Sequence, residues 1–480
     1  MNAVELCRND EQFRKLNGWF ILAVLLVYGI LWRGTTPYLV FDSKNFFARS
    51  DIFINAGFMK GLRESYPVAE VSYPLFLSIL RHFFSESAIF DAVVIVQLAM
   101  LLTSALMIYK LSMRLTRSKV VHVASFFFVS LSPALVLSAL SLYSETFSGF
   151  FFVTWIYAVC RSTYSSQPRT KYAWGFLAAL SMGCLILARV MFLMISLFSI
   201  IGFWMVGKAI KQKGRLTGKQ MVCVVFLTLA LPGLWLARNY TVYRILDIAD
   251  PGRNGVVLAG RFAKSQEHYD LRDVVAGTIN SISERGAQAL FGDNTRYTWS
   301  YANALGYERG GQFQHLIDQN PGYPNKSLTR EVARDIWRSG GVRYLAFGWF
   351  ELVQLLFFET LGQDAIHVKW LVIQRIQENV ILRGIVHVGL SFFYASGLFL
   401  FFFYLIAKKN IIDVNDNGIL CISYLAITLF FFFCFYSLAT CVIRYTFVVA
   451  PIYILLALLG WRRWCARFIL QRERKRVNYA

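Results

Sequence analysis

The sequence contains few charged residues for its length. Asp, Glu, Lys and Arg account for 16% of the 480 residues, whereas a soluble domain carries about 25%. In their place the chain is 56% hydrophobic, with repeated apolar runs near the length of about 20 residues that an α-helix needs to cross a membrane. This balance excludes an ordinary soluble enzyme and predicts an all-α polytopic membrane protein.

Signatures of disulfide-rich, zinc-binding and nucleotide-driven proteins are also missing. The eight cysteines are scattered, without Cys-x-x-Cys pairs or Cys/His spacings, so neither a disulfide framework nor a zinc site is expected. No Gly-rich phosphate loop occurs, which argues against a nucleotide-driven pump. Much of the net charge of +21 lies in short loops and in the C-terminal tail beside apolar runs. That is the orientation signal of a membrane protein, so we expect no nucleic-acid partner.

The apolar runs predict about ten transmembrane helices. The stretch 172–207 is too long for one span, and Arg189 near its middle would be costly at the bilayer centre, so we interpret it as a hairpin with Arg189 at the turn. The approximate spans are 17–32, 89–109, 120–138, 142–160, 172–188, 190–207, 219–237, 384–407, 418–441 and 446–463.

Basic residues in the connecting loops set the orientation, because cytoplasmic loops carry an excess of Lys and Arg. They cluster in 110–119, 161–171, 208–219 and 408–409, and in the C-terminal tail. All of these segments can be cytoplasmic if about seven spans come before the long central region and about three follow it. We therefore expect a multi-pass protein of the cell inner (plasma) membrane, with both termini inside.

The chain then divides into three parts. Segment 344–361 is ambiguous, because counting it as a span would invert everything that follows; we interpret it as an interfacial helix on the outer leaflet. The parts are an N-terminal transmembrane module, 1–237, with a first outer loop of amphipathic helices, 33–88; a small extracytoplasmic cap, 238–383; and a C-terminal transmembrane module, 384–480, with a basic cytoplasmic tail.

Asp42 is the first candidate for chemistry. It lies in the first outer loop shortly after the first span, and Tyr73 and Pro74 open a short apolar helix later in the same loop. A carboxylate held close to the bilayer surface is where a catalytic base would sit in an enzyme with a lipid donor. The ordinary alternative is a helix cap, since Asp is a favoured residue before a helix that begins near Ser43.

Three further acids could share or replace this role. Asp51 and Glu70 lie in the same loop as Asp42. Glu145 follows the third span, where it could favour the start of the next helix. It could equally orient an acceptor or coordinate a cation, and both interpretations stay open.

Arg189, Arg238 and Arg444 all fall at the outer ends of spans, against the positive-inside bias. Arginine binds phosphate oxygens bidentately and keeps its charge near a low-dielectric boundary. Each alone could be a snorkelling anchor or part of an isolated ion pair. Together they indicate a site for a lipid phosphate or diphosphate, because anchoring predicts no preference for this face.

Six short motifs follow one another along nearly the whole chain. They are FDSKNFF (41–47), VSYPLFLSIL (71–80), LYSETF (142–147), LARVMF (187–192), WLARNYTVY (235–243) and RYTFVVAPIYILLA (444–457). In this order they resemble motifs of the C-type superfamily of polyprenyl-phosphate-sugar glycosyltransferases, particularly bacterial relatives of protein O-mannosyltransferases and of the aminoarabinose transferase acting on lipid A. Ser43 stands where some members have a second acid, which leaves the subfamily and any need for a divalent cation open.

The resemblance implies a GT-C fold and a sugar donor on an isoprenoid phosphate. Asp42 would act as general base on an acceptor hydroxyl, with inversion at the anomeric carbon. Arg189, Arg238 and Arg444 would stabilise the leaving lipid phosphate. The Tyr73-Pro74 segment would belong to the loop that holds acceptor or donor, and the acceptor itself could be a lipid, a polysaccharide or a protein.

Two other functions fit the same topology. A transporter or flippase of lipid-linked glycans would place ionisable residues at midplane depth, whereas the spans here are nearly free of charge away from their ends. A ligase or polymerase with a diphosphate-linked glycan donor would share the arginine-rich outer face. The charge pattern favours the transferase over the transporter.

Overall fold

The computed structural model describes most of the transmembrane part of the chain and a smaller share of the central region. Arg444, part of the predicted cap and a few short connections lie outside the described residues. The described residues are 3–39, 41–165, 167–209, 218–249, 265, 270–282, 284–292, 333–334, 337–338, 341–357, 366–369, 374–375, 379–406, 416–439 and 445–479.

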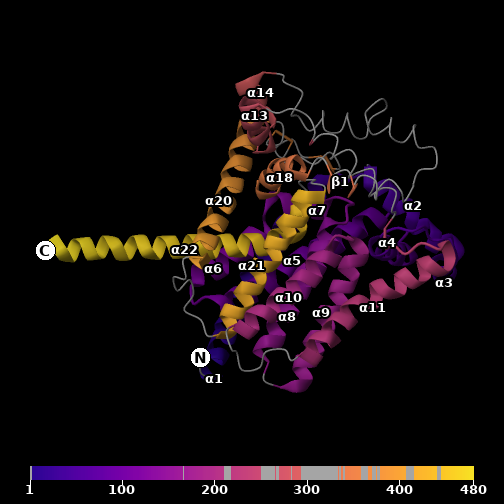
Figure 1. The fold of residues 1–480 in the computed structure, drawn as a ribbon, viewed down its shortest axis with the longest axis horizontal. Helices are drawn as coiled ribbons and strands as arrows, with labels where there is room; N and C mark the ends of the chain where they lie inside the picture. Colours follow the sequence, from indigo (N-terminus) through magenta and orange to yellow (C-terminus); the bar gives the residue numbers. More distant parts are fainter. Residues whose placement is uncertain are drawn as a thin grey trace.

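This part of the chain is almost entirely helical, as the composition predicts (Figure 1). The N-terminal helices are α1 (Ala3–Gly34), α2 (Phe41–Ala56), α3 (Phe58–Lys60), the π-helix η1 (Gly61–Ser65), α4 (Ser72–Phe83), α5 (Ile89–Leu115), α6 (Lys119–Ser130), α7 (Pro133–Leu140), α8 (Glu145–Tyr164), α9 (Pro168–Ala188), α10 (Phe192–Ala209) and α11 (Gly218–Tyr243). The remaining helices are α13 (Leu271–Ile282), α14 (Glu284–Phe291), α18 (Gly341–Leu356), α20 (Val380–Ile406), α21 (Asp416–Ala439) and α22 (Thr446–Tyr479).

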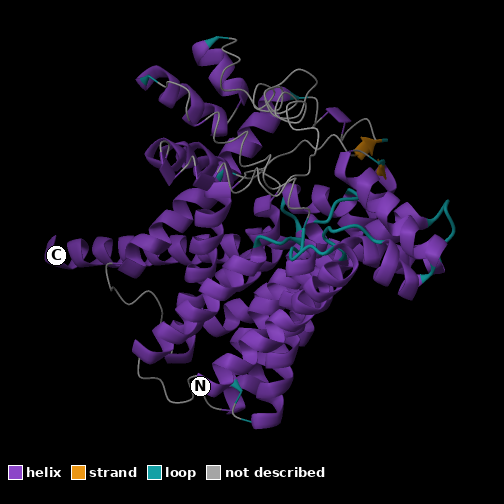
Figure 2. Ribbon diagram, turned by 45° about the vertical axis from the view of Figure 1, so that its right-hand side comes forward, coloured by secondary structure: helices purple, strands orange, loops and turns teal. Residues whose placement is uncertain are grey.

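Two short strands depart from the all-α expectation. β1 (Thr35–Pro37) pairs antiparallel with β2 (Ile366–Val368), with Thr36 opposite His367. The backbone N–H of Lys369 also donates to the Gly34 carbonyl at 2.7 Å. This pairing, drawn in orange in Figure 2, ties the end of α1 to the second half of the chain.

Six described helical segments are long and apolar enough to cross a membrane, so the chain is a polytopic membrane protein. Two of the predicted spans, 142–160 and 219–237, fall in α8 and α11, which are not among the six, and the count of ten therefore stays a prediction. The six are Ile89–Leu115, Lys119–Leu140, Pro168–Ala188, Ile385–Ile406, Gly418–Leu438 and Thr446–Phe468, and two shorter apolar helices are Gly18–Gly34 and Phe192–Val206.

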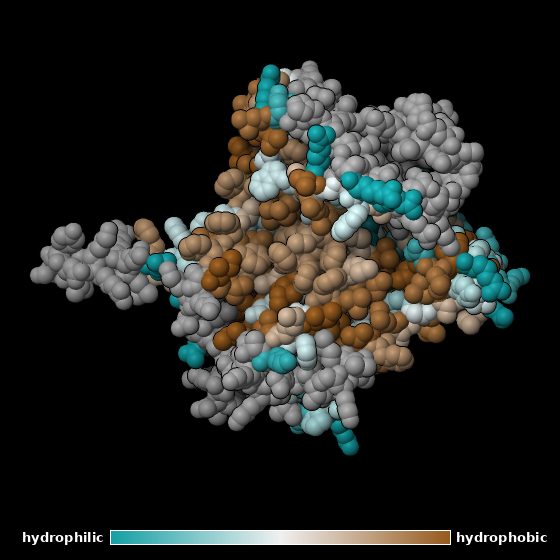
Figure 3. Space-filling view, viewed as in Figure 1, coloured by the Kyte–Doolittle hydropathy of each residue, from teal (hydrophilic) through white to brown (hydrophobic). Residues whose placement is uncertain are grey.

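The surface of the bundle has the character expected for contact with lipid. Large apolar side chains such as Phe176, Phe399 and Phe430 are exposed on membrane helices. In Figure 3 apolar side chains cover the middle of the visible face, and hydrophilic ones gather toward its edges. Apolar side chains whose exposure to water would be unfavourable thus lie where the hydrocarbon of a bilayer can cover them.

Single residues determine a turn between two helices and a break within a predicted span. The hairpin predicted within 172–207 is present: α9 ends at Ala188 and α10 begins at Phe192, with Arg189 in the turn. The predicted span 120–138 is broken into α6 and α7 at Pro133, which lacks a backbone N–H and disfavours helix at the preceding residue. Ser132 caps the restarted helix by accepting from the Leu135 N–H at 3.5 Å.

The described part of the ambiguous segment 344–361 lies in α18, which begins at Gly341 and ends at Leu356; residues 358–361 lie outside the described residues. Its 16 residues give a length of about 24 Å, short of the hydrocarbon thickness of about 30 Å. The Tyr344 hydroxyl donates to the Leu438 carbonyl, and the Tyr453 hydroxyl donates to the Leu356 carbonyl at 2.9 Å. The helix therefore packs on the ends of α21 and α22; its place on the outer leaflet stays a prediction.

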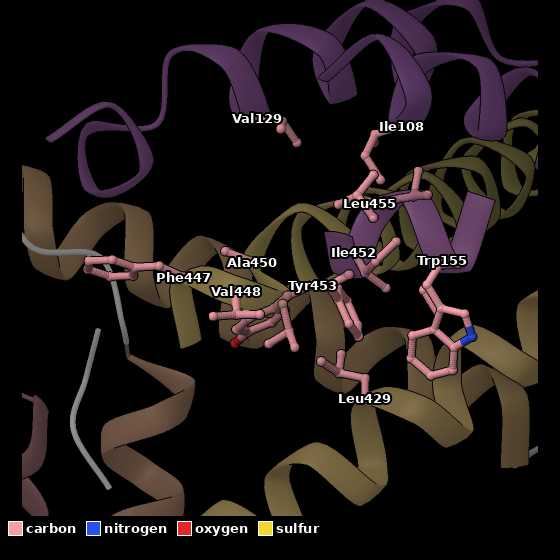
Figure 4. Packing of buried hydrophobic residues seen from close by; sticks show 14 of the residues in the cluster. Ile108, Val129, Trp155, Leu429, Phe447, Val448, Ala450, Ile452, Tyr453 and Leu455 are labelled. Atoms are coloured by element: carbon pink, nitrogen blue, oxygen red, sulfur yellow. The ribbon is translucent and has the colours of Figure 1, made fainter. Parts of the chain in front are cut away.

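The first half of α22 forms the centre of the bundle. Every side chain from Thr446 to Gly460 is buried, and Figure 1 shows the rest of α22 projecting from the other helices. In Figure 4 Ile108 of α5 points toward Leu455, while Leu429 of α21 and Trp155 of α8 lie on the opposite side of α22. This core holds α8 in place, and the first residue of α8 is Glu145, one of the acids selected in the sequence.

Two glycines allow α20 and α22 to cross closely. A Cβ on Gly397 would stand 2.6 Å from the Ala457 carbonyl oxygen, and one on Gly460 would overlap the Gly397 carbonyl oxygen. Small residues at such crossings let helix backbones approach in membranes. The Trp461 indole N–H donates to the Phe393 carbonyl at 2.9 Å beside this crossing.

We expect Gly460→Ala to destabilise the protein by about 1–3 kcal/mol, because the methyl group must push two backbones apart. The measurement is thermal unfolding of the full chain in neutral detergent. Gly389→Ala, on α20 with nothing within 4 Å of the added Cβ, is the matched control and should leave the transition unchanged. Equal transitions for both variants would mean that the helices do not cross at Gly460.

Candidate active site

The first outer loop is held against the start of α8 and the end of α9 by a small apolar cluster. It joins side chains from α2, α4, α5, α8, α9 and the connection between α7 and α8: Phe47, Tyr73, Leu77, Ile89, Val93, Leu142, Phe147 and Ala188. The Val71 N–H also donates to the Leu187 carbonyl at 3.0 Å, and the Ser72 hydroxyl donates to the Cys184 carbonyl at 2.9 Å. These contacts bring two distant parts of the sequence together at one end of the bundle.

Asp42 lies in the first turn of α2, as the sequence predicts. A carboxylate at that position interacts favourably with the helix dipole, so the expected capping role and a chemical role remain compatible. Its side chain is partly exposed. The base candidate therefore has access to solvent, and a rigid helix holds its backbone.

Glu145 and Arg189 form a buried ion pair. Arg189 Nη2 lies 2.8 Å from Glu145 Oε1, and it also donates to the Ser144 hydroxyl at 2.9 Å. The side chain of Glu145 is only 1% exposed and that of Arg189 is 14% exposed. The Arg189 guanidinium also lies over the Tyr445 ring, 4.8 Å from its centroid. The sequence singled out both charges but did not pair them.

The charge of Asp42 also acts on the pKa of Arg189. Burial by itself lowers the pKa of Arg189, but the Glu145 carboxylate and, more weakly, Asp42 act in the opposite direction and hold it above the ordinary value. Arg189 is therefore a permanent cation that two carboxylates stabilise. Asp42, Glu145 and Arg189 make up the candidate site.

Asp51, the first alternative acid, is already engaged. Its carboxylate lies 2.6 Å from Arg81 Nη1, and the same guanidinium reaches Glu86 at 3.1 Å. Arg81 further donates to the Ser50 hydroxyl at 2.8 Å. These contacts fit a role for Asp51 in holding α2 to α4.

Glu70, the second alternative, lies beside Tyr66. The Tyr66 hydroxyl donates to the Glu70 carbonyl at 2.8 Å. Burial raises the pKa of Tyr66; Arg49 opposes this and the Glu70 carboxylate adds to it. Arg49 lies two turns after Asp42 on α2 and is a cation near the site that sequence reasoning missed.

Arg238 is bound to the outer loop and not to the Glu145 pair. Its Nε donates to the Leu62 carbonyl at 2.9 Å, and its Nη2 donates to the Tyr66 carbonyl. Its Nη1 donates to Asn239 Oδ1 at 2.8 Å. Three of its nitrogens are thus used within the protein, and the phosphate-binding role predicted for Arg238 stays untested.

We expect Arg238→Gln to loosen the segment 61–66, because hydrogen bonds to a charged group contribute about 1.5–3 kcal/mol each. Amide hydrogen exchange in that segment should accelerate about tenfold or more. Arg244→Gln, which removes an exposed charge just after the end of α11, is the control and should change nothing in that segment. A weaker affinity for donor lipid with unchanged exchange would instead make Arg238 a phosphate ligand.

Tyr73 and Pro74 are buried under the site. Tyr73 is 1% exposed, and burial, with a further contribution from Glu145, raises its pKa well above the ordinary value. Its hydroxyl donates to Gln97 Oε1 at 3.3 Å, and Gln97 Nε2 donates to the Ser141 carbonyl at 2.6 Å. Tyr73 thus positions the loop before Glu145. The sequence analysis did not select Gln97, although a polar residue inside an apolar span often marks a buried contact.

Arg444, the third arginine of the sequence hypothesis, lies outside the described residues, although Tyr445 beside it packs on Arg189.

In the described part of the chain no group of three or more His, Cys, Asp or Glu could hold a metal ion. Of the two acids at the site, Glu145 is already paired with a guanidinium. The described residues therefore assign no ligands to the divalent cation that the sequence left open.

Comparison with known proteins gives a similarity at the level of structure only. No family model matches the sequence, and no curated protein matches it. The archaeal oligosaccharyltransferase AglB from Archaeoglobus fulgidus, solved with an inhibitory peptide and a dolichol-phosphate, aligns over 97% of this chain and 52% of its own, with 11% identity and a TM-score of 0.47. The apo form of the Archaeoglobus fulgidus oligosaccharyltransferase aligns over 95% and 52%, with 12% identity and a TM-score of 0.49.

ArnT from Cupriavidus metallidurans, in its apo state, aligns over 92% of this chain and 78% of its own, with 11% identity and a TM-score of 0.37. The chain spans about half the length of the two oligosaccharyltransferase structures. Identities and scores this low do not assign an activity, which must be argued from the residues.

Proposed function

We propose that the protein is an integral-membrane glycosyltransferase. It moves a sugar from a polyprenyl-phosphate donor to an acceptor hydroxyl on the extracytoplasmic face of the cell inner membrane. The observation that carries this proposal is the grouping of Asp42, Glu145 and Arg189 at one end of the bundle. A partly exposed carboxylate beside a buried, neutralised cation suits proton abstraction next to a phosphate leaving group.

Asp42 is the general base in this proposal. Its carboxylate accepts the proton of the acceptor hydroxyl while that oxygen forms a bond to the anomeric carbon. The bond between that carbon and the lipid phosphate oxygen breaks, and the electron pair leaves with the phosphate. A phosphate is a good leaving group, so no strong general acid is needed.

Arg189 receives the phosphate charge. One of its nitrogens, Nη2, is used on Ser144 and Glu145, whereas its Nε is buried and has no hydrogen-bond partner among the described residues. Glu145 holds the guanidinium in place, so no reorganisation is needed when charge develops on the departing phosphate. Arg444 remains a second candidate for the same phosphate on the strength of its sequence position.

The proposal specifies inversion at the anomeric carbon. A retaining reaction needs a second carboxylate as nucleophile, and Glu145, the other acid of the site, is bound to Arg189 at 2.8 Å. Single displacement with Asp42 as base therefore fits the pairing best. The sugar is a hexose or pentose, and the acceptor is a lipid, a polysaccharide or a protein.

The test is reconstitution of the full chain in proteoliposomes with polyprenyl-phosphate sugars, lipid and peptide acceptors, and a radiolabelled sugar. The expected result is label moving from the lipid to an acceptor. Movement of lipid-linked glycan between leaflets without any transfer would favour a transporter or flippase. Transfer from diphosphate-linked glycans alone would favour a ligase or polymerase.

A further inference from the structure

A second cationic site lies at the other end of the bundle. Arg161 is about 24 Å along α8 from Glu145, at a rise of about 1.5 Å per residue, and Arg114 lies in the last turn of α5. We propose that these two arginines bind the phosphate of an anionic phospholipid in the leaflet opposite the candidate active site. This site is separate from glycosyl transfer and does not depend on it.

Aromatic rings hold both guanidinium groups. Arg114 Cζ lies 5.0 Å from the centroid of the Tyr164 ring, and Arg161 Cζ lies 5.4 Å from that of Trp174. Arg161 and Tyr164 are one turn apart on α8, so they share a face of the helix. Stacking fixes the planes of the two cations and leaves their edge donors for a phosphate, which arginine binds in a fork.

Among the described side chains, no carboxylate forms an ion pair with either arginine. Arg161 is close enough to act on the charge of Arg114, and both side chains are half-buried. Partly desolvated cations are costly unless an anion joins them.

Tyr164, the residue whose ring lies under Arg114, offers a third donor. Its hydroxyl oxygen is buried and forms no hydrogen bond with a nitrogen or oxygen of the described residues; the Cys421 thiol is a polar neighbour. Buried polar groups in proteins normally have a partner. A phosphate oxygen placed between the two guanidinium groups would supply it.

The surroundings favour a lipid over a free anion. Tyr172 and Phe176 on α9, on either side of Trp174, are 66% and 59% exposed. Residues two apart on a helix point to opposite sides, so these side chains form the outer face of α9, the helix that carries Trp174 on its inner side. The arginines therefore lie beside a helix whose outer face acyl chains can cover, whereas a soluble phosphate would gain nothing from that apolar face.

The test is native mass spectrometry of the full chain in neutral detergent, titrated with phosphatidylglycerol. Arg114→Gln with Arg161→Gln is expected to weaken the tightest lipid adduct at least about tenfold. Arg117→Gln with Lys119→Gln removes two exposed charges from the same end of the bundle and should leave that adduct unchanged. If the first pair of substitutions prevents folding, Tyr164→Phe, which keeps the ring, should still weaken the adduct about threefold.

Equal weakening by both pairs of substitutions would overturn the site, because general positive charge would then explain the binding. So would unchanged binding in Tyr164→Phe together with Arg161→Gln. Phosphatidylcholine and inorganic phosphate complete the titration. Binding of either as tight as that of phosphatidylglycerol would contradict the assignment to an anionic lipid.

Discussion

Asp42→Asn is expected to slow sugar transfer by about 10²–10⁴-fold, the range that general-base catalysis contributes. The amide keeps the shape of the carboxylate and its place in the first turn of α2, but it cannot accept the acceptor proton. Donor affinity should change little, because Arg189 and its partner Glu145 are intact. The measurement is the rate of label transfer in proteoliposomes with donor and acceptor both saturating.

Asp51→Asn is the matched control for this substitution. Both acids lie on α2 in the same outer loop, but Asp51 is paired with Arg81 at 2.6 Å. Its loss should lower stability modestly, since its side chain is 46% exposed and exposed pairs contribute about 0–1 kcal/mol. The transfer rate should stay close to that of the native chain. A rate that falls with Asp51→Asn and survives Asp42→Asn would move the base to Asp51.

Glu145→Gln should have the second large effect. The substitution leaves the buried Arg189 cation without its counter-charge, and breaking a buried pair from one side costs about 3–5 kcal/mol. Thermal unfolding in neutral detergent should show a clear loss of stability. Transfer should fall as well, because the guanidinium is no longer held where the phosphate leaves.

The double substitution Glu145→Gln with Arg189→Gln separates these two effects. Removing both charges removes the uncompensated cation, so stability should recover toward that of the native chain. Transfer should not recover, because the phosphate has lost its partner. A double variant as unstable as Glu145→Gln alone would show that the pair is not the source of the destabilisation.

Hydropathy and charge were sufficient to predict the helices near the site and the turn between two of them. Apolar runs mark the helices, and the high cost of burying Arg189 in a membrane placed the turn between α9 and α10 correctly. Asp42 was expected at the start of a helix and is found in the first turn of α2. These features depend on the residue itself and on a few neighbours, which a sequence displays directly.

Contacts between distant segments could not be read in the same way. Arg189 and Glu145 were both selected, but their pairing depends on how α8 and α9 pack. Arg238 donates to the carbonyls of Leu62 and Tyr66, contacts that its sequence context did not indicate, and its predicted role at a phosphate stays a prediction. Main-chain acceptors are present at every residue, so no pattern in the sequence could have indicated that Arg238 would bind these two.

The contacts of buried polar residues could not be predicted from the sequence either. Tyr73 is buried and donates to Gln97, while its predicted place in the loop that holds acceptor or donor stays a prediction. Gln97 in an apolar span is unusual enough to mark a buried contact. Only the three-dimensional packing shows that the contact positions the residues before Glu145.

The most direct measurement is single-turnover transfer in proteoliposomes, with the anomeric configuration of the product determined by NMR. With the native chain, the sugar should leave the polyprenyl phosphate at the rate at which it appears on the acceptor, with inverted configuration. Asp42→Asn should slow that step and leave donor binding unchanged. Retention of configuration, or an undiminished rate with Asp42→Asn, would contradict a single displacement with Asp42 as base.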